Sequence, residues 1–147
     1  MESAHVTSVI AIQLEHVRHG IGTVRPYLYG PSALLDWVKQ TFFAEVLERT
    51  QAGGGEHVEL KIGDSVVVLE TADPPPPSGA PASVYVYVED VDATFKRALG
   101  GGAQPLASPE DRPYQERGAG VKDSFGNTWW IATYTGTKPQ VNKLVPE

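Results

Sequence analysis

The stretch from residue 83 to residue 133 constrains the fold of this chain more than any other part of the sequence. It begins with SVYVYVE, whose valines alternate with serine and tyrosine, and this period of two predicts a strand with two different faces. Asp90 is placed to accept hydrogen bonds from the first amides of a helix, and the glycines at 100–102 suit its end. Returning strands that end in TWWIAT follow, so the stretch predicts one complete strand–helix–strands unit.

The residues before this stretch predict a rougher copy of the same unit. Residues 23–29 form a predicted strand, and an apolar stripe at helical spacing from Leu34 to Leu47 predicts a helix. Residues 56–62 and 65–71 predict a hairpin across a Gly-Asp turn. In the second unit, we expect the segment after the helix to be a short strand followed by a proline-containing loop at 108–114.

The two halves together resemble the vicinal oxygen chelate superfamily of glyoxalase I, bleomycin-resistance proteins and extradiol dioxygenases. The second half contributes SVYVYVEDVDATFKRALGGGA and DSFGNTWWIAT, and the first contributes RPYLYG, LLDWV and HVELKIGDSVVVLE. The similarity is greatest to the PhnB-like branch and covers roughly residues 23–134. It implies an α+β fold of two βαβββ modules that form a shared curved-sheet cleft, and it implies a homodimer.

This resemblance and the local composition divide the chain into five parts within one glyoxalase-like domain. An N-terminal extension, a first module, a proline-rich linker, a second module and a C-terminal tail are expected at 1–22, 23–72, 73–82, 83–134 and 135–147. Within the extension, the β-branched residues of 6–14 predict an extra strand.

Charge and composition exclude several classes of partner. The formal net charge is −6, whereas binding to nucleic acid or to anionic membranes requires clustered lysine and arginine. No apolar run approaches the length of a membrane-spanning helix, and the N-terminus lacks the pattern of a signal peptide. The absence of cysteine excludes disulfides and thiolate metal sites. We expect a cytoplasmic protein.

The resemblance also implies where a catalytic metal would bind. Catalytic members hold a divalent metal with histidine and glutamate side chains on the first and fourth strands of each module. The matching positions in this sequence are Arg25, Val68, Ser83 and Trp130. These residues offer no ordinary ligand beyond a weak serine hydroxyl.

Other residues supply few replacements for the missing ligands. A shift of two residues along a strand adds Glu70 in the first module and Tyr85 in the second. His57 and Glu59 share one strand face and are weak metal-ligand candidates, but the family places no ligands on that third strand. We therefore expect no metal cofactor, with a divalent metal as the alternative.

The side chains that we infer to face the cleft are rich in tyrosine, with one cation and a few hydroxyls. Such aromatic walls stack on planar or cationic ligands. The candidate ligand-binding residues are Arg25, Tyr27, Tyr29, Glu70, Ser83, Tyr85, Tyr87, Arg117 and Trp130. Arg25 is positioned to pair with a carboxylate or phosphonate, and Arg117 to close the rim. The alternative is that the tyrosines fill a packed core; Trp129 alternates to the helix side and is expected in the core.

Four functions remain open at this point. The favoured one is a protein of the bleomycin-resistance type that binds a small planar or cationic molecule, an antibiotic or a metabolite, without a metal. The main alternative is a divalent-metal-dependent lyase, isomerase or transferase of the glyoxalase type. A metal-free enzyme would use Glu70 or His57 as general base and Arg25 to stabilise an oxyanion. The last is a structural or regulatory module with a vestigial cleft. Whether the protein catalyses a reaction stays open.

Overall fold

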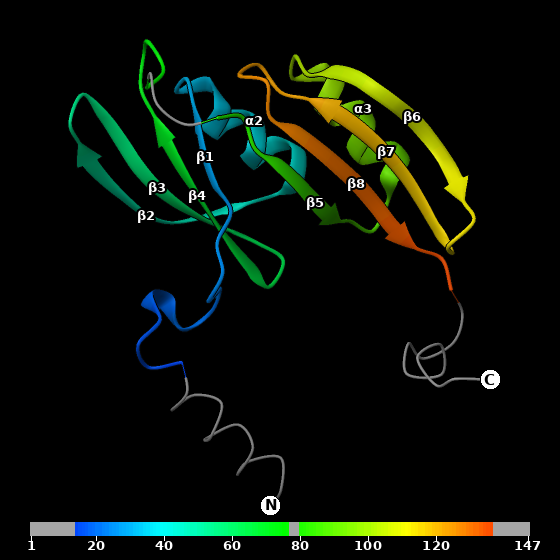
Figure 1. Cartoon of the computed structure of the whole chain (residues 1–147), viewed down its shortest axis with the longest axis horizontal. Helices are drawn as coiled ribbons and strands as arrows, with labels where there is room; N and C mark the ends of the chain where they lie inside the picture. Colours follow the sequence, from blue (N-terminus) through cyan, green and yellow to red (C-terminus); the bar gives the residue numbers. More distant parts are fainter. Residues whose placement is uncertain (1–13, 77–79, 137–147) are drawn as a thin grey trace, which may run out of the picture. The chain divides into compact units, whose positions relative to one another are not determined.

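The computed structural model describes residues 14–76 and 80–136 of the chain (Figure 1). The chain divides after residue 82 into two compact units, module 1 and module 2. The strand predicted at 6–14 falls outside the described residues except for Leu14, which lies in a turn, and most of the predicted tail also falls outside them.

Module 1 contains a four-stranded sheet and one α-helix. A 3-10 turn, η1 (Arg18–Gly20), precedes β1 (Tyr27–Gly30), α2 (Ala33–Phe42), β2 (Glu45–Ala52), β3 (Gly55–Ile62) and β4 (Ser65–Thr71). The strand order is β1-β4-β3-β2, in which β1 runs parallel to β4 and the other neighbours are antiparallel (Figure 1).

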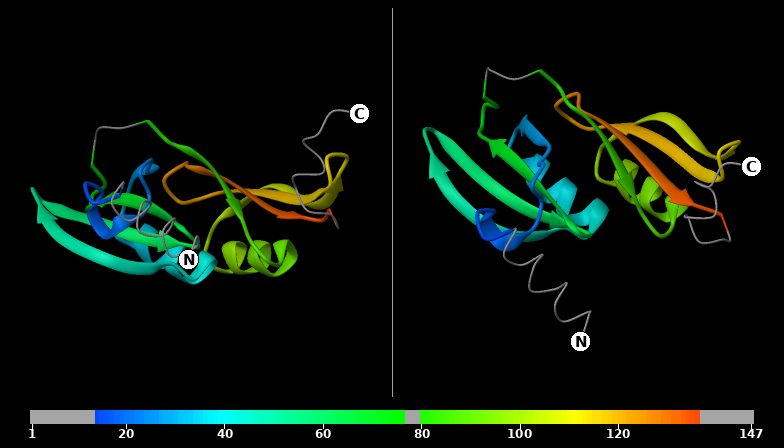
Figure 2. Two further views of the ribbon diagram at one scale, coloured as in Figure 1. Left: turned by 90° about the horizontal axis from the view of Figure 1, so that it is seen from below. Right: turned by 60° about the horizontal axis from the view of Figure 1, so that its bottom comes forward.

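Module 2 repeats this topology. It consists of β5 (Ser83–Tyr87), α3 (Val91–Gly100), β6 (Gln104–Arg112), β7 (Glu116–Lys122) and β8 (Thr128–Tyr134), with the strand order β5-β8-β7-β6. Asp90 caps α3 by accepting a hydrogen bond from the Ala93 amide. The prediction of an α+β fold with two βαβββ modules is confirmed, and Figure 2 shows that both sheets are curved.

Each sheet has two chemically different faces. In module 1 the core side chains Leu28, Val58 and Leu69 are fully buried together with Leu34 and Val38 of α2. Because side chains alternate along a strand, the residues between them point to the opposite face. We call this the helix-free face, and in both modules it contains the tyrosines that the sequence singled out.

The first helix is shorter than the apolar stripe predicted. It ends at Phe42, and Phe43 takes a left-handed conformation with φ 55° and is 73% exposed. A left-handed residue stops a helix, so Val46 and Leu47 belong to β2 instead. Apolar residues spaced by three and four fit a helix and, over so short a stretch, do not exclude a strand.

The loop predicted at 108–114 is also wrong, because β6 continues to Arg112. β6 is the edge strand of its sheet, and its pairing with β7 shifts register on either side of Ala107. An edge strand with such irregularities accommodates proline without losing a ladder hydrogen bond. Pro105 and Pro109 therefore do not end this strand.

The turn between β7 and β8 is built around the buried carboxylate of Asp123. Its Oδ1 accepts hydrogen bonds from the Phe125 and Asn127 amides at 2.9 and 3.0 Å. Its Oδ2 accepts from the Asn127 side chain at 2.9 Å and from the Trp129 indole at 2.8 Å. This carboxylate explains the DSFGNTWW motif, and the prediction that Trp129 belongs to the core is confirmed. No helix among the described residues has the length and apolarity to cross a membrane.

Candidate functional site

Strand register gathers acidic, basic and aromatic groups on the helix-free face of module 1. Across β1 and β4, Tyr27 lies opposite Val68 and Tyr29 opposite Glu70. Across β3 and β4, His57 lies opposite Glu70. Since cross-strand partners share a face, the predicted ligand-binding residues Tyr27, Tyr29 and Glu70 do lie together.

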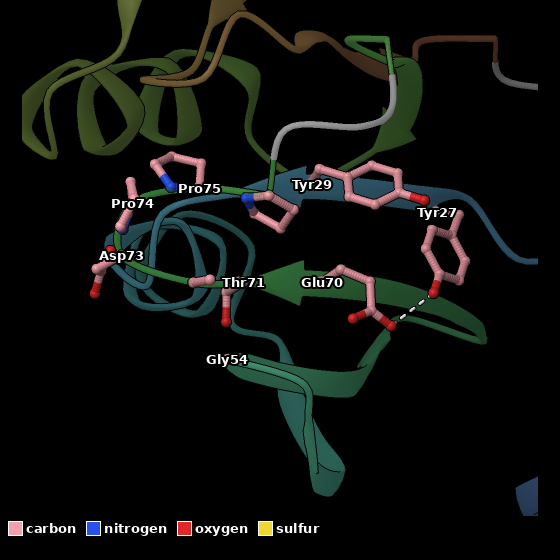
Figure 3. A pocket seen from close by; sticks show the side chains of 11 residues that line it. Tyr27, Tyr29, Gly54, Glu70, Thr71, Asp73, Pro74 and Pro75 are labelled. Atoms are coloured by element: carbon pink, nitrogen blue, oxygen red, sulfur yellow. Dashed lines mark hydrogen bonds between the residues drawn. The ribbon is translucent and has the colours of Figure 1, made fainter.

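Glu70 is the centre of this group. The Tyr27 hydroxyl donates to its Oε2 at 2.6 Å (Figure 3), and the same oxygen is hydrogen-bonded to Nδ1 of His57. Burial and the bond to Glu70 raise the pKa of Tyr27 to about 12, and the bond to Glu70 raises the pKa of His57. Figure 3 shows the second carboxylate oxygen of Glu70 pointing away from Tyr27.

A chain of polar contacts continues from His57 across the sheet. Nε2 of His57 lies 3.3 Å from Glu59 Oε2, and the other oxygen of this buried carboxylate contacts His19 at 3.0 Å. His19 also contacts Glu48 at 3.2 Å, and Arg18 donates to both oxygens of Glu48 at 2.6 Å. The contacts attach η1 to β2 and β3.

Arg25 belongs to this attachment. Its guanidinium donates to the backbone oxygens of Gly22 at 2.7 Å, Ile21 at 2.9 Å and Arg18, and to Glu59 at 3.2 Å. These bonds use four of the five donors of the guanidinium, and the side chain is 16% exposed. The geometry therefore gives Arg25 a structural role in place of the predicted pairing with a ligand or an oxyanion.

A pocket of about 600 Å³ opens on this face of module 1. Its walls include Tyr27, Tyr29, Gly54, Gly55 and the prolines 74–76, and its charged lining groups are Glu70 and Asp73 (Figure 3). Asp73 accepts hydrogen bonds from the Ser32 amide and hydroxyl, which lower its pKa. Both charged groups of the lining are therefore carboxylates.

Module 2 arranges similar residue types on its own helix-free face. The hydroxyls of Tyr85 and Tyr87 both donate to the buried carboxylate of Glu116. Burial and this bond raise the pKa of Tyr85, and the same bond raises that of Tyr87. Gly118 and Ala132, paired across β7 and β8, leave space for the carboxylate beside the two rings.

The remaining residues that were predicted to bind a ligand lie on different faces of the module 2 sheet. Ser83 and Trp130 share the face of Tyr85, because Ser83 is two residues from Tyr85 and Trp130 lies directly opposite it. Arg117 lies on the other face, where it binds Asp92 of α3 at 2.8 and 3.1 Å and Asp111 at 3.1 Å. Arg117 therefore does not close the rim of the aromatic face, because it lies one residue from Glu116 and points the opposite way.

Sequence reasoning missed Glu116 and Arg112 as site residues, and it missed the contacts of His19 with Glu48 and Glu59. Alternation along the last strands contained the signal for Glu116, since it lies two residues before Gly118 on the same face. His19 and Glu48 carried no such signal, because their contact joins a 3-10 turn to a strand that is distant in the sequence.

The residues present do not fit the metal site that the fold family implies. On the helix-free faces of β1, β4, β5 and β8, all of them described, Glu70 is the sole carboxylate and imidazole is absent. Elsewhere, His19, Glu48 and Glu59 bring ligand atoms within 4.8 Å of one another. The two carboxylates of that group are already paired with Arg18 and Arg25, so an ion-pair network accounts for its geometry.

The raised pKa of His57 predicts a pH-dependent contribution to stability. A pKa above the ordinary value of 6.5 means that the folded state binds the proton more tightly. The contribution is then complete below 6.5 and is lost as the pH rises through the folded-state pKa. We expect the stability difference between wild type and His57→Gln to shrink from pH ~5.5 to pH ~9. Urea unfolding of both proteins across this pH range measures the difference, and His16→Gln, which changes an exposed histidine, is the control. A difference that grows with pH would contradict the raised pKa of His57.

Comparison with known proteins agrees with this architecture. The model of the Glyoxalase/Bleomycin resistance protein/Dioxygenase superfamily matches residues 30–131. The chain belongs to this superfamily. Curated relatives include uncharacterised proteins of Mycobacterium bovis and Mycobacterium tuberculosis, each 30% identical over 110 residues and 67% of this chain. The match spans 72% of the first relative and 65%, just under two thirds, of the second.

Solved structures of other proteins show the same fold. TioX from Micromonospora sp. ML1 is 26% identical, with a TM-score of 0.61 over 78% of this chain and 98% of TioX. A glyoxalase/bleomycin resistance protein/dioxygenase family enzyme from Burkholderia phytofirmans PsJN is 19% identical, with a TM-score of 0.59 over 76% of this chain and 95% of that enzyme. The second similarity concerns the fold alone.

Proposed function

We propose that this superfamily member binds a small planar cation, an antibiotic or a metabolite, on the helix-free face of module 1 without a metal. The observation that carries the proposal is the pocket in which Tyr27 and Tyr29 stand beside the carboxylate of Glu70, with Asp73, which is bonded to Ser32, at its other end (Figure 3). Tyrosine faces attract cations and stack on planar rings, and a carboxylate fixes the charged end. The acidic net charge of the chain also favours cationic ligands.

The arrangement of the pocket supports rigid binding. The two tyrosine rings have centroids 5.5 Å apart and are tilted by 51°, and the bond from Tyr27 to Glu70 fixes one ring and one carboxylate oxygen together. Side chains that are already held lose little entropy when a ligand binds. The second oxygen of Glu70 is then available to the cation.

Removing the charge of Glu70 tests the proposal. Proflavine, a planar cation, and acridone, a neutral molecule with the same three-ring skeleton, serve as probes in calorimetric titrations. Wild type is expected to bind proflavine more tightly than acridone, and Glu70→Gln to weaken proflavine binding about tenfold or more, because a charge-assisted contact is lost. Acridone binding should change little.

Two further variants test whether an effect of Glu70→Gln comes from the loss of the carboxylate charge in the pocket. Tyr27→Phe keeps the ring and the carboxylate, so it should retain most of the proflavine affinity. Glu56→Gln changes a carboxylate that is paired with Arg49 outside the pocket and is the matched control. Equal affinity of wild type and Glu70→Gln for proflavine, or a preference for acridone, would overturn the proposal.

Two finer expectations stay predictions. One is membership of the PhnB-like branch, and the other is the homodimer. Light scattering of the purified protein, with and without proflavine, measures the mass of the assembly and decides the second.

A further inference from the structure

The helix-free face of module 2 contains a pocket of its own, of about 390 Å³. Three large aromatic side chains line it and are well exposed: Tyr85 at 51%, Tyr114 at 60% and Trp130 at 38%. Exposed apolar groups gathered in one place mark a binding surface more often than scattered ones do. We propose that this pocket is a second small-molecule site, and that it takes a planar aromatic acid.

Two glycines of β7 shape this face: Gly118 lines the pocket, and Gly120 lies two residues further along the same face of the strand. A Cβ atom on Gly120 would lie 2.4 Å from Cζ3 of Trp130, so the indole ring lies directly against the bare backbone at this position. A Cβ atom on Gly118 would lie 3.5 Å from Nε of Arg112. Glycine at position 120 therefore lets the Trp130 indole lie against the backbone of β7, whereas the distance at Gly118 is an ordinary van der Waals contact that places Arg112 beside the strand.

One wall of the pocket is fixed before any ligand arrives. The Tyr85 hydroxyl donates to Glu116, and the ring packs against Tyr87 with centroids 5.5 Å apart at 65°. Glu116 is buried, accepts both tyrosine hydroxyls and does not line the pocket. The ring of Tyr85 is thus presented to a ligand at little entropic cost.

The charge of the lining selects the ligand. Arg112 is the charged residue among those that line the pocket. Among the described residues, its side chain pairs with Glu110 at 3.1 Å, and the Glu110 side chain is 66% exposed. An exposed ion pair of this kind is weak, so a ligand carboxylate can replace Glu110 and bind the guanidinium through two parallel bonds.

The two modules therefore select opposite charges. The pocket of module 1 has carboxylates in its lining, whereas that of module 2 has a guanidinium. All lining residues of the second pocket lie between 85 and 131, within module 2. This inference does not depend on the cation site of module 1.

Calorimetric titration with 2-naphthoate and with 2-naphthamide, its neutral analogue, tests the proposal at physiological salt. Wild type is expected to bind the acid about tenfold more tightly than the amide, and Arg112→Gln to abolish that preference. Arg49→Gln, which removes an exposed arginine of module 1, is the matched control. Glu110→Gln should tighten naphthoate binding, because it frees the guanidinium.

Further variants make the test specific to this pocket. Gly120→Val should prevent binding of both probes by displacing the indole, and circular dichroism checks that it folds. Trp130→Phe should remove most of the fluorescence quenching by naphthoate. Any of three outcomes would overturn the proposal. The first is equal affinity of wild type for the acid and the amide, and the second is unchanged naphthoate affinity in both Arg112→Gln and Glu110→Gln. The third is a loss of naphthoate binding in Glu70→Gln. Proflavine binding by the Arg112→Gln protein reports separately on module 1.

Discussion

Replacement of Asp123 by alanine is expected to lower the free energy of unfolding by about 3–5 kcal/mol. The buried carboxylate accepts four hydrogen bonds between 2.8 and 3.0 Å, two from backbone amides and two from the side chains of Asn127 and Trp129. Alanine would remove the one carboxylate that accepts all four of these bonds. The indole of Trp129 is fully buried, so water cannot replace the lost acceptor without opening the core.

Urea unfolding followed by fluorescence measures this loss. Asp123→Asn is expected to fall between wild type and alanine, because one oxygen is kept while an amide group faces the donors on the other side. Asp64→Ala, in the exposed turn between β3 and β4, is the matched control and should change stability by less than about 0.5 kcal/mol. If Asp123→Ala were no worse than this control, the carboxylate would not hold the turn.

Replacement of Gly55 by alanine is expected to destabilise module 1 by about 2–4 kcal/mol. A Cβ atom at this position would lie 2.1 Å from the backbone oxygen of Thr71 and 2.8 Å from Cβ of Ala72. A backbone oxygen cannot turn away as a flexible side chain does, so β3 and β4 must separate locally. Gly55 also lines the pocket, and the shift should weaken proflavine binding.

The neighbouring glycine provides a close control. Gly54 lines the same pocket, but a Cβ atom there meets nothing within 4 Å. Gly54→Ala should therefore leave stability within about 0.5 kcal/mol of wild type. Thermal unfolding of the two variants side by side checks the pair; equal stabilities would mean that β3 approaches β4 less closely here.

The parts of the fold that the sequence predicted correctly depend on local, repeated patterns. Neighbouring residues alone predict three of these features: the alternation in β5, the Asp90 cap of α3 and the Gly63-Asp64 turn. β2 was missed because its apolar residues continue a helical spacing, and the left-handed conformation of Phe43 that ends α2 has no glycine to reveal it. Pro109 was read as a loop signal, although an edge strand tolerates it.

In the candidate site, too, the features with a local pattern were predicted and those that depend on irregular segments were missed. The shared face of Tyr27, Tyr29 and Glu70 follows from strand alternation and was predicted. The bonds of Arg25 to η1 and Glu59 depend on the path of an irregular segment, which no periodicity encodes. Arg117 was placed on the aromatic rim because a one-residue difference in register decides which face of β7 it occupies.

The contacts of η1 redefine where the first folding unit begins. The superfamily model starts at residue 30, yet Arg18 and His19 supply contacts to Glu48 and Glu59 on β2 and β3. A truncated chain that began at the family boundary would lose nearly all of β1 and would leave the buried Glu59 carboxylate without its cation, Arg25. The packed unit is therefore longer than its family signature, and a shortened chain that keeps these contacts has to start upstream of Arg18.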